Sequence, residues 1–388
     1  MKFAYYPGCS ADSSGVEYGM SMVRTAEILG IELFELDDWN CCGATSAHST
    51  DKMLSLALPA RNLAIAEKQG MDMLAPCAAC YSRHRNVEYV IEHDPDMKHR
   101  IEEIIDKKLE GSTQTVSILD VLANKIGPAT IASKVTQPLT GMKAACYYGC
   151  LLVRPVEYTG YDDPEDPQTM DEVMKALGAD VLDWSHKVEC CGAAMVTSRP
   201  DVGNRMLYHV LQGAKESGAE CIVTACPLCM LNLDMRQAAV EKEYHTKFNL
   251  PIYYVTELLA FACGDAPETV GINKHFVDAI PYLNEVKKRA AEAEAQARAQ
   301  QDKKETVTED PELLQKKINS MIKAFEKGPD KMAGRLLDDE SRASVLAEII
   351  SNDEKKRNKL AELMVSDKDK AVKVADAFVT GELKKRNE

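Results

Sequence analysis

The sequence of 388 residues lacks an apolar run long enough to cross a membrane. Its longest apolar stretch, YYVTELLAFACG at residues 253–264, falls short of the roughly 20 residues that a spanning helix needs, and it contains Glu257. The amino-terminal residues MKFAYYPGCS also lack the basic leader, apolar run and cleavage site of a signal peptide. These absences predict a cytoplasmic protein without a direct membrane span.

Basic residues are also scarce in the body of the chain. Residues 1–283 contain 24 Lys and Arg against 39 Asp and Glu, whereas residues 284–388 are nearly balanced, with 23 against 22. A nucleic-acid-binding surface needs a basic face, so this composition speaks against a nucleic-acid partner. The acidic body favours protein partners, or small ligands held at a local basic site.

Cysteine, in contrast, is abundant, and most of it follows an internal repeat. In a reducing compartment thirteen cysteines predict metal binding or catalysis rather than structural disulfides. The pattern C-x31-CC-x34-C-x2-C in the first half returns as C-x39-CC-x34-C-x2-C in the second. The ten cysteines are Cys9, Cys41, Cys42, Cys77 and Cys80, then Cys150, Cys190, Cys191, Cys226 and Cys229. We expect the additional residues of the second half in the loop YTGYDDPEDP, residues 158–167.

A short apolar run precedes each cysteine group. KFAYY and KAACYY predict a strand before the first cysteine, IELFEL and ADVLDW a strand before Cys-Cys, and MDMLA and CIVTA a strand before the C-x2-C. Helical stretches such as VEYGMSMVRTAEILG and TMDEVMKALG connect these strands and end in glycine. Each half is therefore predicted to be an α/β domain of βαβαβ type with a parallel sheet. Because the carboxyl ends of parallel strands share one edge, the five cysteines of a half should meet there.

The adjacent cysteines limit the chemistry of such a site. A turn at Gly43 or Gly192 would let both thiols face one centre. A disulfide between neighbours is strained, because their Cα atoms lie about 3.8 Å apart. Structural zinc takes four ligands, and an ordinary cubane cluster also takes four thiolates. Five thiols fit a larger or irregular iron–sulphur cluster better than either.

These motifs, YYPGCS, CCGA, PCAAC, YYGC and the second CCGA, resemble the paired CCG domains of the heterodisulfide reductase B subunit, over roughly residues 1–265. The resemblance implies two noncubane [4Fe-4S] clusters, one held by each set of five cysteines. It also implies that a disulfide binds between the clusters, each of which provides an iron and one electron to one sulphur. The implied partners are a C subunit with cubane clusters and a flavin-bearing A subunit, since this chain has no flavin, nucleotide or cubane-ferredoxin motif.

Three functions of different class remain open. The first is the catalytic subunit of a disulfide reductase complex, acting on the coenzyme M–coenzyme B heterodisulfide or a related low-molecular-weight disulfide. The second is an electron-transfer subunit of a lactate, glycolate or succinate oxidoreductase without disulfide chemistry. The third is a zinc-stabilised scaffold. Two complete motifs favour the first, because a disulfide has two sulphurs to bind.

Residues near the motifs are weaker candidates. Four arginines could hold anionic groups of a substrate or form ion pairs with nearby carboxylates: Arg83, Arg154, Arg199 and Arg236. Three histidines could donate protons to product thiolates, or lie outside the ligand set as supporting or surface residues: His48, His84 and His186. The three cysteines outside the repeat are expected in the core: Cys146, Cys221 and Cys263.

The predicted organisation has four parts. A first CCG domain at residues 1–140 and a second at 141–270 are followed by a charged helical linker at 271–305 and a small helical extension at 306–388. The extension contains four amphipathic stretches, PELLQKKINSMIKAF, RASVLAEIISND, KRNKLAELMVSD and KAVKVADAFVTGEL. It could dock a partner or be an appendage without a separate role.

Overall fold

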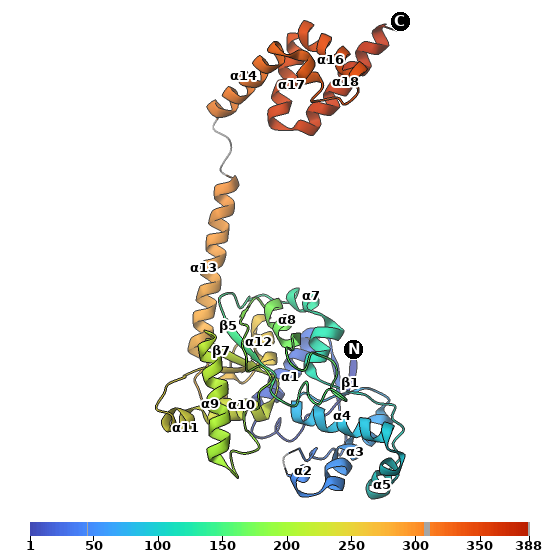
Figure 1. Cartoon of the computed structure of the whole chain (residues 1–388), viewed down its shortest axis with the longest axis vertical. Helices are drawn as coiled ribbons and strands as arrows, with labels where there is room; N and C mark the ends of the chain where they lie inside the picture. Colours follow the sequence, from blue (N-terminus) through green and yellow to red (C-terminus); the bar gives the residue numbers. More distant parts are fainter. Residues whose placement is uncertain (45, 306–310, 387–388) are drawn as a thin grey trace. The chain divides into compact units, whose positions relative to one another are not determined.

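The computed structural model describes residues 1–44, 46–305 and 311–386. It divides into two compact units, Met1–Glu294 and Ala295–Glu388, which are described separately below (Figure 1). The first unit contains two four-stranded parallel sheets, one from each half of the repeat. The predicted α/β class with two pseudo-symmetric domains is confirmed.

The two sheets have the same strand order. The first is ordered β2-β1-β3-β4, with β1 (Lys2–Tyr5), β2 (Glu32–Glu35), β3 (Met73–Leu74) and β4 (Thr115–Val116). The second is ordered β6-β5-β7-β8, with β5 (Lys143–Tyr147), β6 (Asp180–Val181), β7 (Cys221–Thr224) and β8 (Ile252–Tyr254). Six strands lie where the sequence predicts them. The expectation of three strands per half was wrong, because β4 and β8 add a fourth that lies beyond the repeated cysteines.

Helices connect the strands as parallel crossovers. The first half has α1 (Val16–Leu29), α2 (Ala47–Thr50), α3 (Lys52–Gln69), α4 (Ala78–His93), α5 (Pro95–Ile105), α6 (Ile118–Asp120), a π-helical turn η1 (Val121–Ile126) and α7 (Pro128–Ala132). The second half has α8 (Thr169–Ala176), α9 (Pro200–Glu216), α10 (Pro227–Met235), α11 (Gln237–Glu243) and α12 (Val255–Ala262), followed by η2 (Ile272–Lys274) and α13 (Ile280–Glu305). As predicted, α1 and α3 end at glycines with positive φ, Gly30 and Gly70.

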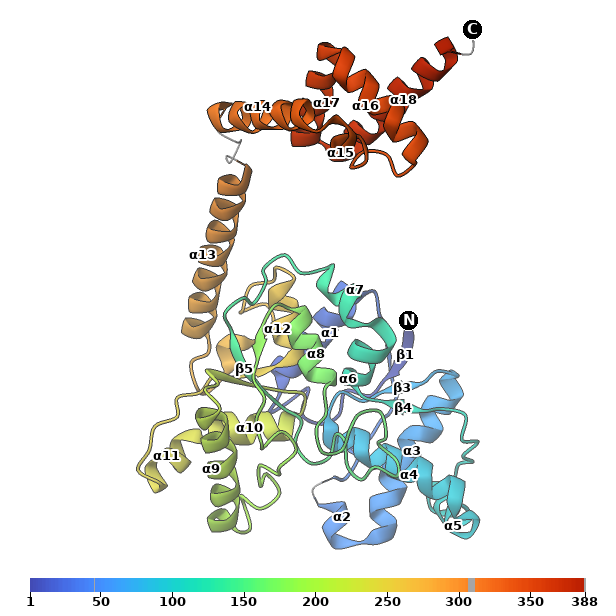
Figure 2. The same ribbon diagram turned by 45° about the horizontal axis from the view of Figure 1, so that its top comes forward.

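The two halves exchange helix contacts. Helix α1 of the first half packs on α12 of the second, and α8 of the second half packs on η1 and α7 of the first (Figures 1 and 2). Ser21 and Thr256 join α1 to α12 through a hydroxyl–hydroxyl hydrogen bond of 2.7 Å, and the Thr25 hydroxyl donates to the Thr256 carbonyl at 3.1 Å. The halves therefore share one hydrophobic core.

Tyr18 lies where the two halves meet. Its buried hydroxyl is 3.0 Å from the carbonyl of Pro76 and 3.0 Å from that of Ala225, and its ring stacks on Tyr254 with centroids 4.1 Å apart. These carbonyls directly precede Cys77 and Cys226. The hydroxyl thus ties together the two loops that carry the C-x2-C motifs.

Replacing Tyr18 by phenylalanine should therefore lower the free energy of unfolding by about 1–3 kcal/mol, because two buried carbonyls lose their donor. Tyr254→Phe is the matched control, since that buried hydroxyl has no hydrogen-bond partner among the described residues. Urea unfolding followed by tryptophan fluorescence measures both effects, because Trp39 and Trp184, the chain's two tryptophans, lie in this unit. Equal losses in the two variants would contradict the bridging role.

The second unit is helical throughout its described part. It contains α14 (Pro311–Lys327), α15 (Pro329–Ala333), α16 (Glu340–Asn352), α17 (Glu354–Ser366) and α18 (Lys368–Arg386). Its own core includes Phe325, Leu346, Ile350, Leu360 and Val379. The four predicted amphipathic stretches form α14, α16, α17 and α18. Residues 306–310 of the predicted extension lie outside the described residues, and the predicted four-part boundaries stay a prediction.

None of the helices within the described ranges is long and apolar enough to span a bilayer.

Candidate thiol sites

The repeated cysteines follow the carboxyl ends of the strands, at one edge of each sheet. In the first half Cys9 follows β1, Cys41 and Cys42 follow β2, and the C-x2-C pair follows β3, with Cys77 at the start of α4. The second half repeats this order after β5, β6 and β7. The topology expected from the spacing is therefore observed. The role of these ten cysteines as ligands stays a prediction.

Within the first half the thiols lie in contact as linked pairs. The Cys41 sulphur is 3.8 Å from that of Cys9, and the Cys42 sulphur is 3.3 Å from that of Cys80. Contacts with Cys41 and Cys80 lower the pKa of the Cys42 thiol. Cys9 and Cys41 are exposed, whereas Cys42, Cys77 and Cys80 are buried.

The second half encloses its thiols more fully. All five of them line one cavity of about 100 Å³. The other lining residues include Ala193, Ala194, Leu151 and Leu228 from the same half, and Ala44, Ala78 and Ala79 from the first. The two sites are also close together, because the Tyr18 hydroxyl lies 3.0 Å from each of the carbonyls that directly precede Cys77 and Cys226.

The predicted turn at the adjacent cysteines is present in both halves. Gly43 has a φ of 71° and Gly192 a φ of 78°, a region that favours glycine. Each glycine N–H points to the sulphur two residues before it, at 3.4 Å from Cys41 and 3.4 Å from Cys190. Contact with Cys150, together with this N–H, lowers the pKa of Cys190 to about 6 against the effect of burial. A thiolate at neutral pH is the form that binds a metal.

A second glycine pair lets the backbone approach the thiols. Gly8 and Gly149 have φ values of 74° and 69°. A Cβ at Gly8 would lie 3.3 Å from the Cys80 sulphur, and one at Gly149 would lie 3.1 Å from the Cys229 sulphur. Both positions therefore need glycine for the conformation and for the close sulphur contact.

Sequence analysis missed a tyrosine in each half. The Tyr6 hydroxyl donates to the carbonyl of Asn40 at 3.0 Å, and the Tyr147 hydroxyl donates to that of Glu189 at 2.6 Å. Asn40 and Glu189 precede the adjacent cysteines, so each tyrosine supports the same turn. Burial and the surrounding thiols raise the pKa of both tyrosines. A tyrosine three residues before the first cysteine of each half was the signal that could have revealed them.

Of the three predicted histidines, one contacts the site backbone. His84 is fully buried, its Nδ1 donates to the Cys80 carbonyl at 2.7 Å, and its Nε2 accepts from the Asn62 amide at 3.3 Å. Burial lowers the pKa of His84, which favours the neutral ring. The His48 and His186 rings are each in hydrogen-bonding contact with a neighbouring serine, Ser49 and Ser185, and the His48 N–H donates to the Gly43 carbonyl at 3.4 Å.

The four candidate arginines differ in their surroundings. Arg154 pairs with Glu165 at 2.8 Å, and Arg199 pairs with Asp201 at 2.8 Å, which agrees with the ion-pair alternative. The Arg83 Nε is buried without a hydrogen-bond partner in the described part of the chain. Arg236 is the C-cap residue of α10. A substrate-binding role for any of the four stays a prediction.

Across residues 1–44, 46–305 and 311–386, no three His, Cys, Asp or Glu side chains converge as they would around one metal ion. A polynuclear cluster has no such requirement, because its ligands bind different metal atoms. The thiol-lined cavity, the paired sulphurs and the glycine cradles fit such a cluster. Outside the repeat, Cys146 and Cys221 are buried as expected, and Cys263 is half-buried.

Two parallel α/β halves with five cysteines beyond the strand ends of each sheet define a duplicated cysteine-rich protein. The cysteine-rich domain family CCG matches residues 3–83 and 144–234. The chain belongs to the family of duplicated CCG proteins that includes the B subunits of heterodisulfide reductases.

Two relatives match over nearly their full length. The "8-methylmenaquinol:fumarate reductase membrane anchor subunit" of Wolinella succinogenes is 32% identical, over 72% of this chain and 98% of the relative. The B subunit of the "Ferredoxin/F(420)H(2)-dependent CoB-CoM heterodisulfide reductase" of Methanosarcina acetivorans is 30% identical, over 74% of this chain and 97% of the relative. Both relatives are named as subunits of reductases.

One solved structure shares the fold. A hypothetical protein from Helicobacter pylori superimposes with a TM-score of 0.58 at 12% sequence identity, over 72% of this chain. The match covers 52% of that chain, so this protein spans about half its length. At this identity the likeness concerns the fold alone.

Proposed function

We propose that the chain is the catalytic iron–sulphur subunit of a heterodisulfide reductase-type complex. It would reduce the coenzyme M–coenzyme B heterodisulfide, or a related low-molecular-weight disulfide, to two thiols. The observation that carries the proposal is the closeness of the two thiol sites, whose C-x2-C loops the Tyr18 hydroxyl joins directly before Cys77 and Cys226. A disulfide has two bonded sulphurs, and two adjacent sites offer one position to each.

The ten repeated cysteines would hold two noncubane [4Fe-4S] clusters. Cys9, Cys41, Cys42, Cys77 and Cys80 would bind one, and Cys150, Cys190, Cys191, Cys226 and Cys229 the other. When bound, these clusters supply one-electron transfers and soft irons with affinity for the sulphurs of a substrate. Thiolates are soft ligands, and five per half match the family to which the chain belongs.

The chain's own residues would hold the site and exclude water from it. Tyr6 and Tyr147 fix the Cys-Cys turns through the carbonyls that precede them. Alanines from both halves form much of the remaining wall of the enclosed second cavity. Reduction of a disulfide to two thiols consumes two electrons and two protons. The electrons would come from a cubane-cluster C-type subunit and a flavin-bearing A-type subunit, and Arg83 remains a candidate for an anionic group of the substrate.

A second candidate function has one specific observation in its favour. The relative at 32% identity is named as a subunit of a fumarate reductase, whose name mentions no disulfide. In that case the two sites would pass electrons between partner subunits without binding a substrate sulphur.

The first test is anaerobic purification with iron, sulphide and zinc analysis. We expect about eight irons per chain from two four-iron clusters. Paramagnetic resonance after titration with thiols, and with a panel of disulfides, should reveal a thiol-induced signal and identify the substrate class. Clusters that ignore every thiol would favour the electron-transfer candidate. Zinc without iron would refute both.

A further inference from the structure

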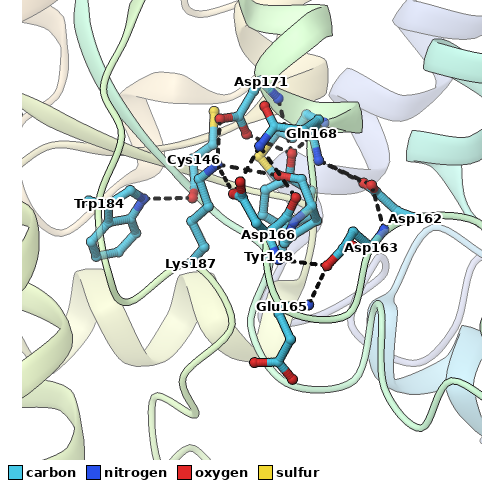
Figure 3. Close-up of polar contacts among 12 residues, drawn as sticks. Cys146, Tyr148, Asp162, Asp163, Glu165, Asp166, Gln168, Asp171, Trp184 and Lys187 are labelled. Carbon is cyan, nitrogen blue, oxygen red and sulfur yellow. Dashed lines mark hydrogen bonds and ion pairs between the residues drawn. The ribbon is translucent and has the colours of Figure 1, made fainter.

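The second half of the repeat contains a buried ammonium group, that of Lys187. The Lys187 side chain is 5% exposed, and its Nζ is 2.9 Å from a carboxylate oxygen of Asp166 and 2.9 Å from one of Asp171 (Figure 3). Burial alone would lower the pKa of Lys187, but the two carboxylates outweigh it and raise the pKa. An unpaired buried charge costs several kcal/mol, so this ammonium depends on its carboxylate partners.

Lys187 also contacts the backbone directly before Cys150, and it precedes the Cys-Cys turn in the chain. Its carbonyl accepts the N–H groups of Tyr148 at 2.9 Å and Gly149 at 3.1 Å, immediately before Cys150. In the chain it lies three residues before Cys190. A change in the position of Lys187 would therefore shift the backbone next to Cys150 and Cys190, two of the five cysteines of the second site.

Tyr148 completes the connection between the charged pair and the thiols. Its hydroxyl donates to Asp171 at 2.6 Å and accepts the N–H groups of Met170 and Asp171 at 2.8 and 3.1 Å (Figure 3). The same residue lines the thiol cavity together with Cys150. The buried ion pair of Lys187 and Asp171 is thus linked to the second site through the Tyr148 side chain.

Within residues 1–44 and 46–140 no such arrangement is present. When the halves are aligned on their cysteines, Asp38 takes the place of Lys187 and Pro7 that of Tyr148. The Asp38 side chain is 84% exposed and pairs with Arg61. Asp166 comes from the loop at residues 158–167, in which we place the additional residues of the second half. The two halves therefore share their thiols but differ in charge at the position three residues before the Cys-Cys pair.

We propose that Lys187 is a positioning residue that gives the second thiol site a reduction potential different from that of the first. The inference rests on the proposed function in one respect, that both sites hold iron–sulphur clusters. A fixed charge in a buried region is weakly screened, and nearby charge is one of the factors that set cluster potentials. Lys187 would raise the potential of the second site, and Asp171 would lower it.

The decisive comparison is between Asp171→Asn and Lys187→Gln, by redox titration of the paramagnetic signal. Each is combined with Cys42→Ser, so that only the second site loads. We expect Asp171→Asn to raise the midpoint potential of the second site and Lys187→Gln to lower it. Lys187→Arg keeps the charge and should leave the midpoint potential of the second site unchanged. Asp38→Asn, at the exposed equivalent position, should shift neither site.

Opposite shifts are the electrostatic signature, because damage to packing would move both variants in the same direction or remove iron from both. Shifts of the same sign, or no shift in Asp171→Asn, would overturn the proposal. If Lys187→Gln fails to load iron, Asp171→Asn alone still decides. Iron content and disulfide turnover of the unmodified chain test the proposed function separately, since the potentials can be measured whether or not a disulfide is reduced.

Discussion

Replacing Cys191 by serine should remove iron from the second site and leave the first site loaded. The Cys191 thiol is buried and lines the enclosed cavity. A serine hydroxyl is a hard and weakly acidic group, so it is a poor replacement for a soft thiolate. We expect the iron content to fall to about half. Disulfide turnover should fall by more than about a hundredfold, since even outer-shell substitutions at metal sites cost about 10–100-fold.

Cys221→Ser is the matched control for this experiment. Cys221 is also fully buried, but it lies within β7 and its sulphur is 3.7 Å from the Lys143 carbonyl. The same chemical change there should leave the iron content and the paramagnetic signals intact. Cys42→Ser should give the reciprocal result, with only the second site loaded. Full iron content in Cys191→Ser would contradict the assignment of ligands.

Replacing Gly149 by alanine should also remove iron from the second site, although no ligand changes. The new Cβ would lie 3.1 Å from the Cys229 sulphur, closer than carbon and sulphur normally approach. A residue other than glycine at positive φ costs a further 1–2 kcal/mol or so. We therefore expect a lower free energy of unfolding together with about half of the iron.

Gly30→Ala separates these two effects. Gly30 has a φ of 68°, against 69° for Gly149, but nothing lies within 4 Å of the position its Cβ would take. This variant should show the backbone cost in a urea titration and retain all of its iron. Equal iron content in the two alanine variants would show that the sulphur contact has no role in cluster binding.

The sequence predicted those parts of the fold that repeat. The equal spacing from the Cys-Cys pair to the C-x2-C fixed the alignment of the halves, and the apolar runs before each cysteine group predicted six strands. Strands β4 and β8 were missed because they have no cysteine to mark them. Strand β4 is only two residues long, and β8 lies at the edge of an apolar stretch that continues into α12.

The contacts between the halves could not be predicted from the pattern. The packing of α1 on α12 depends on which surfaces of two similar units face each other, and hydrophobic periodicity reports only that a face is buried. Lys187 was missed for a related reason. A single lysine near acidic residues reads as a surface residue, and only the folded structure shows that Asp166 of the loop at 158–167 and Asp171 of α8 both pair with it.

The exchange of helices between the halves has a consequence for the ancestry of the chain. One half alone would leave the face of its first helix that includes the buried Ser21 and Thr25 without the helix that covers it. Two identical copies related by a twofold axis would cover each other, so a homodimer is the natural forerunner of this fold. Two copies of one chain must carry the same residue at each equivalent position, whereas the two halves of a single chain can differ. Here one half places an exposed aspartate, and the other a buried lysine, at the same position.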